Sequence, residues 1–180
     1  MDLIAPLLIV RLVIGLGFAA HGAQKLFGWF GGYGLAGTGG FLESLGFRPG
    51  RLFAAAAGTA ELAGGVLLAL GLGGPIGPAL IISAMTVAIL TVHVRNGFFA
   101  ASNGFELPLL YVLIGVLYAF AGFGPASLDA AFGWTPVWTP LVTWAFVALG
   151  FIGGALNLTL RRTPGAAPAP AASETLDPAV

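Results

Sequence analysis

Two histidines and two glutamates stand inside or beside the long apolar runs of this chain. His21 and Glu61 lie in the first and second runs, His93 comes near the end of the third, and Glu106 begins the fourth. Ionisable side chains are expensive in a membrane, by roughly 2.5–3.5 kcal/mol for a charged residue at a helix centre, and are often functional. Imidazole and carboxylate groups are the usual proton carriers near neutral pH. We therefore predict that His21, Glu61 and His93 transfer protons.

A second set of polar residues lies close to these three along the chain. Arg11, Phe18 and Lys25 are seven residues apart, which keeps them on nearly one face of a helix, with His21 one turn before Lys25. The simplest arrangement is one pocket near one membrane surface, shared by histidines, carboxylates and cations. In such a pocket we expect six residues to bind substrate: Arg11, Gln24, Lys25, Arg95, Asn96 and Glu106.

Several of these residues also have a structural interpretation. Arg11 and Glu61 can form a buried ion pair between helices that fixes their register. Lys25 can extend toward the membrane surface without any further role. Glu106 can stabilise the N-terminus of a helix, and Asp129 favours a helix cap or an interfacial turn over catalysis. The sequence leaves these alternatives open.

Composition places the chain in a membrane. Hydrophobic residues make up 58% of its 180 residues and charged residues only 8%, whereas a soluble domain is about 25% charged. The length allows one helical bundle without a separate soluble domain. The formal net charge is zero, with no basic block, so we expect no nucleic-acid partner. The absence of cysteine excludes disulfides, thiolate nucleophiles and cysteine-ligated metal centres.

Five apolar segments predict an all-α bundle of membrane-spanning helices. None shows the period-2 alternation of a membrane β-barrel, and the first lacks the basic start of a cleaved signal peptide. Glycine and proline cluster between the segments, at 31–32, 37–40 and 73–75, and predict loops there. The Pro- and Ala-rich tail, 163–180, predicts disorder beyond a bundle over 1–162. The predicted spans are 3–27, 52–72, 76–94, 106–120 and 140–160.

Arginine positions predict the orientation of the bundle. With five spans, all loop arginines fall on one side, which the positive-inside rule makes cytoplasmic. The N-terminus then lies outside and the C-terminus inside the cell (plasma or inner) membrane. Glycine and alanine faces on the spans also permit a homo-oligomer. The loop arginines are Arg48, Arg51, Arg95, Arg161 and Arg162.

Four motifs give the chain a family resemblance. The segment from Arg11 through His21-Gly22-Ala23-Gln24-Lys25 resembles the opening of the DoxX family, and the segments 58–65, 93–99 with Glu106, and 122–129 resemble its later motifs in the same order. The resemblance covers about residues 3 to 130. It implies a four-helix membrane core, here followed by a fifth, C-terminal transmembrane helix. Some members of that family are the membrane subunit of a thiosulfate:quinone oxidoreductase or belong to membrane redox complexes.

Three functions follow from these observations. The first is a quinone-linked oxidoreductase subunit with a bound quinone and a soluble or membrane redox partner. No GxGxxG follows a predicted strand, so no dinucleotide fold is implied, and the chain has no HExxH motif and no cysteine. No metal site is expected. The second is a non-catalytic scaffold that recruits a redox or secreted partner through the loops 31–50 and 122–140. The third is a small proton-coupled carrier that uses the same intramembrane charges.

Overall fold

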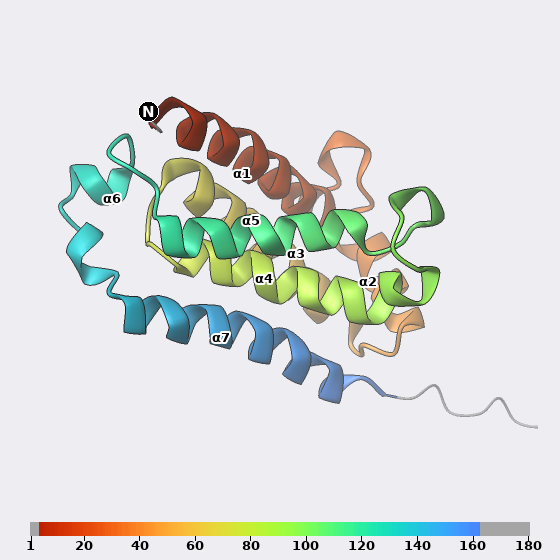
Figure 1. Ribbon diagram of the computed structural model, residues 1–180. Helices are drawn as coiled ribbons and strands as arrows, with labels where there is room; N and C mark the ends of the chain where they lie inside the picture. The colour runs from red at the N-terminus through yellow and green to blue at the C-terminus, as the bar shows by residue number, and fades with distance from the viewer. Residues whose placement is uncertain (1–3, 163–180) are drawn as a thin grey trace, which may run out of the picture.

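The computed structural model describes residues 4–162, which form helices and no strands. Five helices form the bundle. Successive ones run antiparallel, and the start of the first and the end of the last lie at opposite ends of the bundle (Figure 1). The predicted all-α bundle is confirmed. The predicted start at residue 3 and the tail 163–180 lie outside the described residues. The five helices are α1 (Ile4–Phe27), α3 (Gly50–Leu70), α4 (Ile76–Ala88), α5 (Glu106–Ala121) and α7 (Pro140–Asn157).

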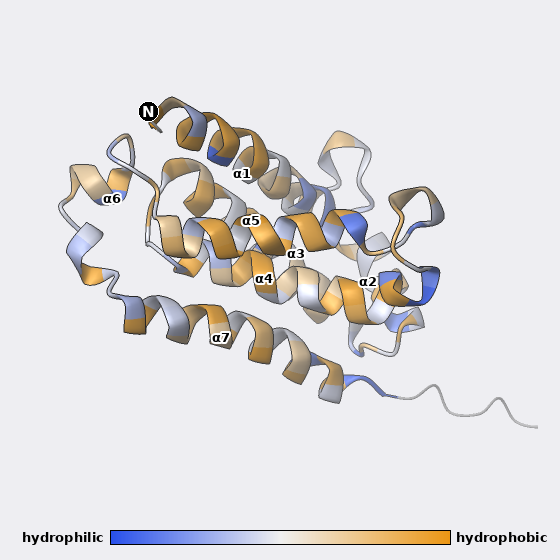
Figure 2. Ribbon diagram, in the orientation of Figure 1, coloured by the Kyte–Doolittle hydropathy of each residue, from blue (hydrophilic) through white to orange (hydrophobic). Residues whose placement is uncertain are grey.

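Four helical segments are long and apolar enough to cross a membrane. They are Ile4–Phe27, Gly50–Leu70, Ile76–Asn96 and Pro140–Leu160, and hydrophobic residues dominate their length (Figure 2). The third continues from α4 through a π-helical turn, η2 (Ile89–His93), and a 3-10 turn, η3 (Val94–Asn96). The chain is therefore a multi-pass membrane protein.

Helix α5 is the weakest of the five predicted spans. Its 16 residues cover about 24 Å, less than the roughly 30 Å of a hydrocarbon core. It nevertheless runs alongside the longer helices (Figure 1) and packs closely against α4. The case for a fifth crossing rests on that position within the bundle.

Glycine residues bring α1 and α3 into close contact. A Cβ atom added at Gly22 would lie 2.6 Å from the carbonyl oxygen of Gly58, and one added at Gly15 would lie 2.6 Å from the amide nitrogen of Ala69. Small residues permit such approach where lipid supplies no hydrophobic drive between helices. The contact between Gly22 and Gly58 sets the end of α1 beside the middle of α3, and so sets Lys25 beside Glu61.

The loop predicted between the first two spans contains a helix, α2 (Gly34–Ser44). The loop prediction was wrong at Gly37, Gly39 and Gly40, because low intrinsic helix propensity is outweighed here by packing. A Cβ at Gly39 would lie 3.0 Å from the amide nitrogen of Arg51, so α2 rests directly on the start of α3. Glu43 Oε1 also accepts a hydrogen bond of 2.8 Å from the amide of Gly50.

Shorter helical turns complete the connections. The four-residue helix α6 (Leu128–Ala131) begins at Ser127, whose hydroxyl accepts from the amide of Ala130. The remaining 3-10 turns are η1 (Trp29–Gly31), η4 (Ala100–Ser102), η5 (Thr135–Val137) and η6 (Leu158–Leu160).

Arg11 closes the end of the bundle that carries the N-terminus. Its side chain is 2% exposed. It donates from Nη1 to the carbonyl oxygen of Phe123 at 3.2 Å and from Nη2 to that of Ala126. The ion pair between Arg11 and Glu61 that the sequence left open is not formed, because backbone carbonyls of the loop after α5 accept from the guanidinium.

Asp129 also stabilises this end of the bundle, by accepting hydrogen bonds from the turn between α3 and α4. Its carboxylate oxygens accept from the amides of Gly73 at 2.8 Å and Gly74 at 2.7 Å, in the turn between α3 and α4. Its own amide donates to the carbonyl oxygen of Gly71 at 3.0 Å. These contacts give Asp129 the structural role in an interfacial turn that the sequence favoured.

Candidate functional site

A cavity of about 320 Å³ lies at the end of the bundle opposite to Arg11 and Asp129. It is enclosed by the C-terminal half of α1, the middle of α3, the turn η2 and the start of α5. Four of the nine predicted site residues line it, and aromatic rings form part of its wall. The main lining side chains are Phe18, His21, Lys25, Glu61, His93 and Tyr111. The predicted meeting of both histidines with a carboxylate and a cation is thus observed.

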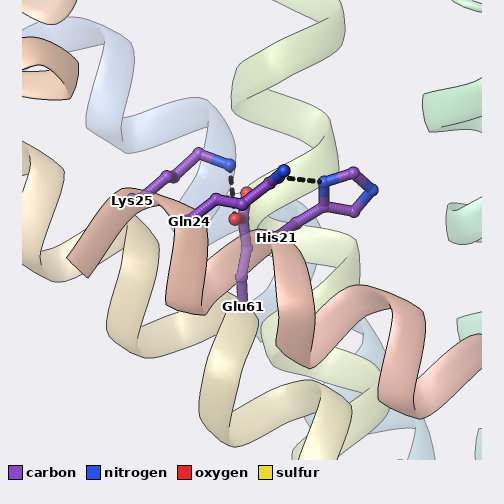
Figure 3. A network of polar contacts seen from close by, with 4 residues as sticks. All are labelled: His21, Gln24, Lys25 and Glu61. Carbon is purple, nitrogen blue, oxygen red and sulfur yellow. Dashed lines mark hydrogen bonds and ion pairs between the residues drawn. The ribbon is translucent and has the colours of Figure 1, made fainter. Parts of the chain in front are cut away.

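Glu61 is the most buried polar group of the cavity. The residue is 3% exposed, and its Oε2 forms an ion pair with Lys25 Nζ. Figure 3 shows Glu61 rising from α3 toward Lys25 on α1. The Lys25 side chain is 32% exposed, so one partner of this pair reaches the surface while the other does not.

His21 is oriented by Gln24. The two side chains hydrogen-bond between Nδ1 and Oε1 at 3.0 Å (Figure 3). Gln24 Nε2 donates to the carbonyl oxygen of Phe30 at 3.2 Å, which assigns Oε1 to the histidine side and makes His21 Nδ1 the donor. The neutral ring then keeps Nε2 as an acceptor. Gln24 therefore positions the imidazole.

His93 is oriented by backbone. Its Nδ1 donates to the carbonyl oxygen of Asn103 at 2.8 Å, since a carbonyl can only accept. It lies at the end of the π-helical turn η2, a kind of helix irregularity that is frequent at functional sites. His93 thus repeats the arrangement of His21, with Nδ1 engaged and Nε2 available to a ligand or a proton.

The other predicted residues lie around the cavity. Asn96 Nδ2 donates to the carbonyl oxygens of Val92 and Asn103, at 3.2 and 3.1 Å. Glu106 Oε2 accepts from the amide of Ala100 at 2.8 Å. Both side chains hold the segment that forms one wall. Arg95 is exposed beside them, and Arg11 lies at the far end of the bundle, so the predicted single pocket does not include it.

Tyr111 was missed by the sequence analysis. Its ring lies 5.1 Å from that of Phe18 and 6.4 Å, edge-on, from the imidazole of His21. The available signal was a hydroxyl-bearing residue five positions after Glu106 in an otherwise apolar run. Among residues 4–162, no group of three or more histidine, cysteine or acidic side chains is placed to hold a metal ion.

Comparison with known proteins identifies the first half of the chain. The model of the DoxX family matches residues 6–94. An uncharacterized protein of Haemophilus influenzae is 33% identical over 126 residues, which cover 68% of this chain and 87% of that protein. No solved structure matches the chain. The matched range includes His21, Lys25, Glu61 and His93, and it ends before α5.

Proposed function

Because the chain belongs to the DoxX family and crosses the membrane several times, we propose that it is the membrane subunit of a quinone-linked oxidoreductase. The observation that carries this proposal is the cavity itself, where Lys25, Glu61 and two oriented histidines meet. Its volume of about 320 Å³ is at the lower end of small-molecule sites, roughly 300–1,000 Å³. This size suits a single-ring quinone headgroup whose apolar tail remains in lipid.

The chemistry assigned to the cavity is proton-coupled reduction of the quinone. The two carbonyl oxygens of the ring accept hydrogen bonds from Lys25 Nζ and from a protonated imidazole of His21 or His93. Tyr111 and Phe18 offer ring surfaces on which a quinone stacks. Two electrons and two protons convert the quinone to the quinol. The protons pass through Glu61 and the histidines.

The electrons come from outside this chain. The proposal assigns them to a reduced flavin or iron–sulfur centre on a partner subunit, because the chain carries no cysteine with which to supply thiol chemistry. Arg48, Arg51, Arg95 and Arg161 follow or precede the helix ends on the cavity side, which the positive-inside rule makes cytoplasmic. The partner then docks at the cytoplasmic face of the cell membrane.

Quinone binding to the purified chain in lipid nanodiscs tests the proposal. A short-tailed benzoquinone is titrated against wild type, His21→Ala and Glu61→Gln, with Glu43→Gln as the matched carboxylate control outside the cavity. We expect saturable binding that weakens by about tenfold or more in the two cavity variants, as for loss of a charge-assisted hydrogen bond. Helix content by circular dichroism should stay constant.

The opposite outcome selects a different function. If wild type shows no saturable binding, the quinone proposal fails for this chain. The scaffold interpretation then becomes the better one, with partner binding through the segments 31–50 and 122–140. Loss of partner capture on changing those segments, with His21→Ala and Glu61→Gln without effect, would establish it.

A further inference from the structure

A second cavity lies on the other side of Glu61. It has a volume of about 240 Å³ and sits between α2, α3, α4 and α7. Its lining includes Phe47, Ala57, Glu61, Ser83 and Asn157. Among residues 4–162, Glu61 is the only residue that lines both this cavity and the one with the histidines. A single buried carboxylate therefore separates two cavities.

Three polar side chains line the second cavity, and each has an atom without a protein partner among residues 4–162. Glu61 Oε2 is paired with Lys25, but Oε1 has no hydrogen bond within residues 4–162 and is not sealed from the surrounding space. Among residues 4–162, the side-chain hydroxyl of Ser83 and the side-chain amide of Asn157 also make no hydrogen bond to protein. Glu61 is buried, and Ser83 and Asn157 are half-buried. Ordered water is the usual partner of such polar groups where protein supplies none.

Small residues leave room for that water. Ala56, Ala57, Ala60 and Ala84 form much of the wall. Water needs about 30 Å³ per molecule and two to four polar partners. A cavity of about 240 Å³ with three polar side chains therefore has the room and the polar groups for a few water molecules. An apolar lipid chain in the same space would leave those three groups unsatisfied.

The second cavity reaches the arginine-rich end of the bundle. Phe47, 1% exposed, forms part of its wall, and the Arg161 guanidinium lies 5.7 Å from the centre of that ring. Arg161 Nε donates to the carbonyl oxygen of Leu45 at 2.8 Å, and the Arg162 amide donates to that of Gly46 at 2.8 Å. The residues after η6 thus pack against the segment 45–47, beside this end of the second cavity.

We propose that the second cavity is a water-filled path that carries protons from this membrane surface to Glu61. Ser83 and Asn157 hold the water, Glu61 Oε1 accepts the proton, and the carboxyl releases it into the cavity that contains the histidines. The inference deepens the proposed function, since it supplies the protons that quinone reduction consumes. It assigns α7, which lies beyond the family match at residues 6–94, a part in the site.

A thiol placed in the cavity tests whether it contains water. The chain has no cysteine, so the S–H infrared band of Ser83→Cys is unique. Val147→Cys, in the hydrophobic core at 5% exposure, is the control thiol away from the second cavity. On transfer to D2O we expect the Ser83→Cys thiol to exchange at least about tenfold faster than the control, because proton exchange of a thiol needs water contact. Equal rates would overturn the proposal.

Filling the cavity tests whether the path leads to Glu61. In Ala57→Leu, the added side chain displaces water, and we expect the exchange of the Ser83→Cys thiol to fall by about tenfold. Quinone binding should be unchanged, because Ala57 does not line the first cavity. An unchanged rate of thiol exchange in Ala57→Leu would place the water path elsewhere. Thiol exchange needs no quinone, so failure of the water path and failure of quinone binding are distinguishable.

Discussion

The two ends of the bundle use buried charge in different ways. At the end with the N-terminus, Arg11 and Asp129 bond to backbone groups of two loops. At the other end, Lys25 and Glu61 bond side chain to side chain, next to open space. Backbone partners cannot leave without unfolding a loop, whereas a side-chain partner can rotate toward a ligand. The first arrangement fixes structure, and the second leaves charges that can change partner.

This difference predicts which variants lose stability and which lose binding. Changes at Arg11 and Asp129 should lower the free energy of unfolding, and changes around Glu61 should act mainly on the ligand. The Phe18 to Lys25 segment and Arg11 lie on one helix, so the comparison can be made within a single element. The predictions below run from the largest expected effect to the smallest.

Arg11→Met should be the most destabilising. It removes the guanidinium that bonds the carbonyl oxygens of Phe123 and Ala126, and hydrogen bonds to a charged group contribute about 1.5–3 kcal/mol each. We expect a loss of about 3 kcal/mol in unfolding by denaturing detergent. Arg11→Lys, which keeps the charge but not the fork geometry, should recover only part of that loss. A stability equal to wild type in Arg11→Met would show that the loop does not depend on this residue.

Asp129→Asn should have the next largest effect. The amide keeps one acceptor for Gly73 but turns an NH2 group toward the amide of Gly74, which then lacks its acceptor. An unsatisfied buried donor costs about 1–3 kcal/mol, so we expect about 2 kcal/mol by the same unfolding measurement. Glu43→Gln, whose carboxylate accepts a single amide hydrogen bond, is the control and should lose less. Equal losses in the two variants would show that Asp129 does not stabilise the turn between α3 and α4 more than Glu43 stabilises the start of α3.

The sequence was sufficient to predict the helices but not their relative placement. Apolar runs bounded by glycine and proline predicted spans at 106–120 and 140–160, close to the observed Glu106–Ala121 and Pro140–Leu160. The sequence could not decide the partner of Glu61, because α1 offers two cations and no local pattern indicates which of them lies at the depth of Glu61 in α3. The contact of Gly22 with Gly58 decides this, and it depends on the packed pair.

The missed elements have a similar cause. Helix α2 is rich in glycine, which has a low helix propensity. It forms because tertiary packing against α3 stabilises it. The histidine pair was predicted to share a pocket, but the orientation of His93 depends on the π-helical turn and on the carbonyl oxygen of Asn103. Neither the π-helical turn nor the position of that carbonyl oxygen can be predicted from residue types. The second cavity is visible only when alanines of α3 and α4 are placed opposite Asn157.

At the cavity end, Lys25→Met should destabilise more than Glu61→Gln. Glu61 has a side chain only 4% exposed, whereas that of Lys25 is 32% exposed. Removing Lys25 therefore leaves a buried carboxylate unpaired, and removing the carboxylate leaves an ammonium that can reach the surface. Because Lys25 is partly exposed, we expect Lys25→Met to lose about 1–2 kcal/mol, as for an unsatisfied buried acceptor, and Glu61→Gln to lose less than about 1 kcal/mol.

The double variant Lys25→Met with Glu61→Gln completes a mutant cycle with these two. Replacing both members of a buried pair is often close to neutral, so the double variant should be more stable than Lys25→Met alone. A double variant that loses the sum of the single effects would show that the pair does not act as a unit. The ends of the bundle would then be less different than their contacts indicate.

His21→Ala and His93→Ala should have the smallest effect on stability and a clear effect on binding. His21 is exposed and His93 half-buried, and each loses one hydrogen bond through Nδ1. Such positions change stability by about 0.5 kcal/mol or less, while loss of a charge-assisted hydrogen bond should weaken quinone binding about tenfold. Unfolding and quinone titration on the same samples separate the two. Gln24→Ala sharpens the test, because it keeps both imidazoles and removes the hydrogen bond that orients His21, together with the one to the carbonyl oxygen of Phe30. If Gln24→Ala weakens binding as much as His21→Ala does, the orientation of the ring matters as much as its presence.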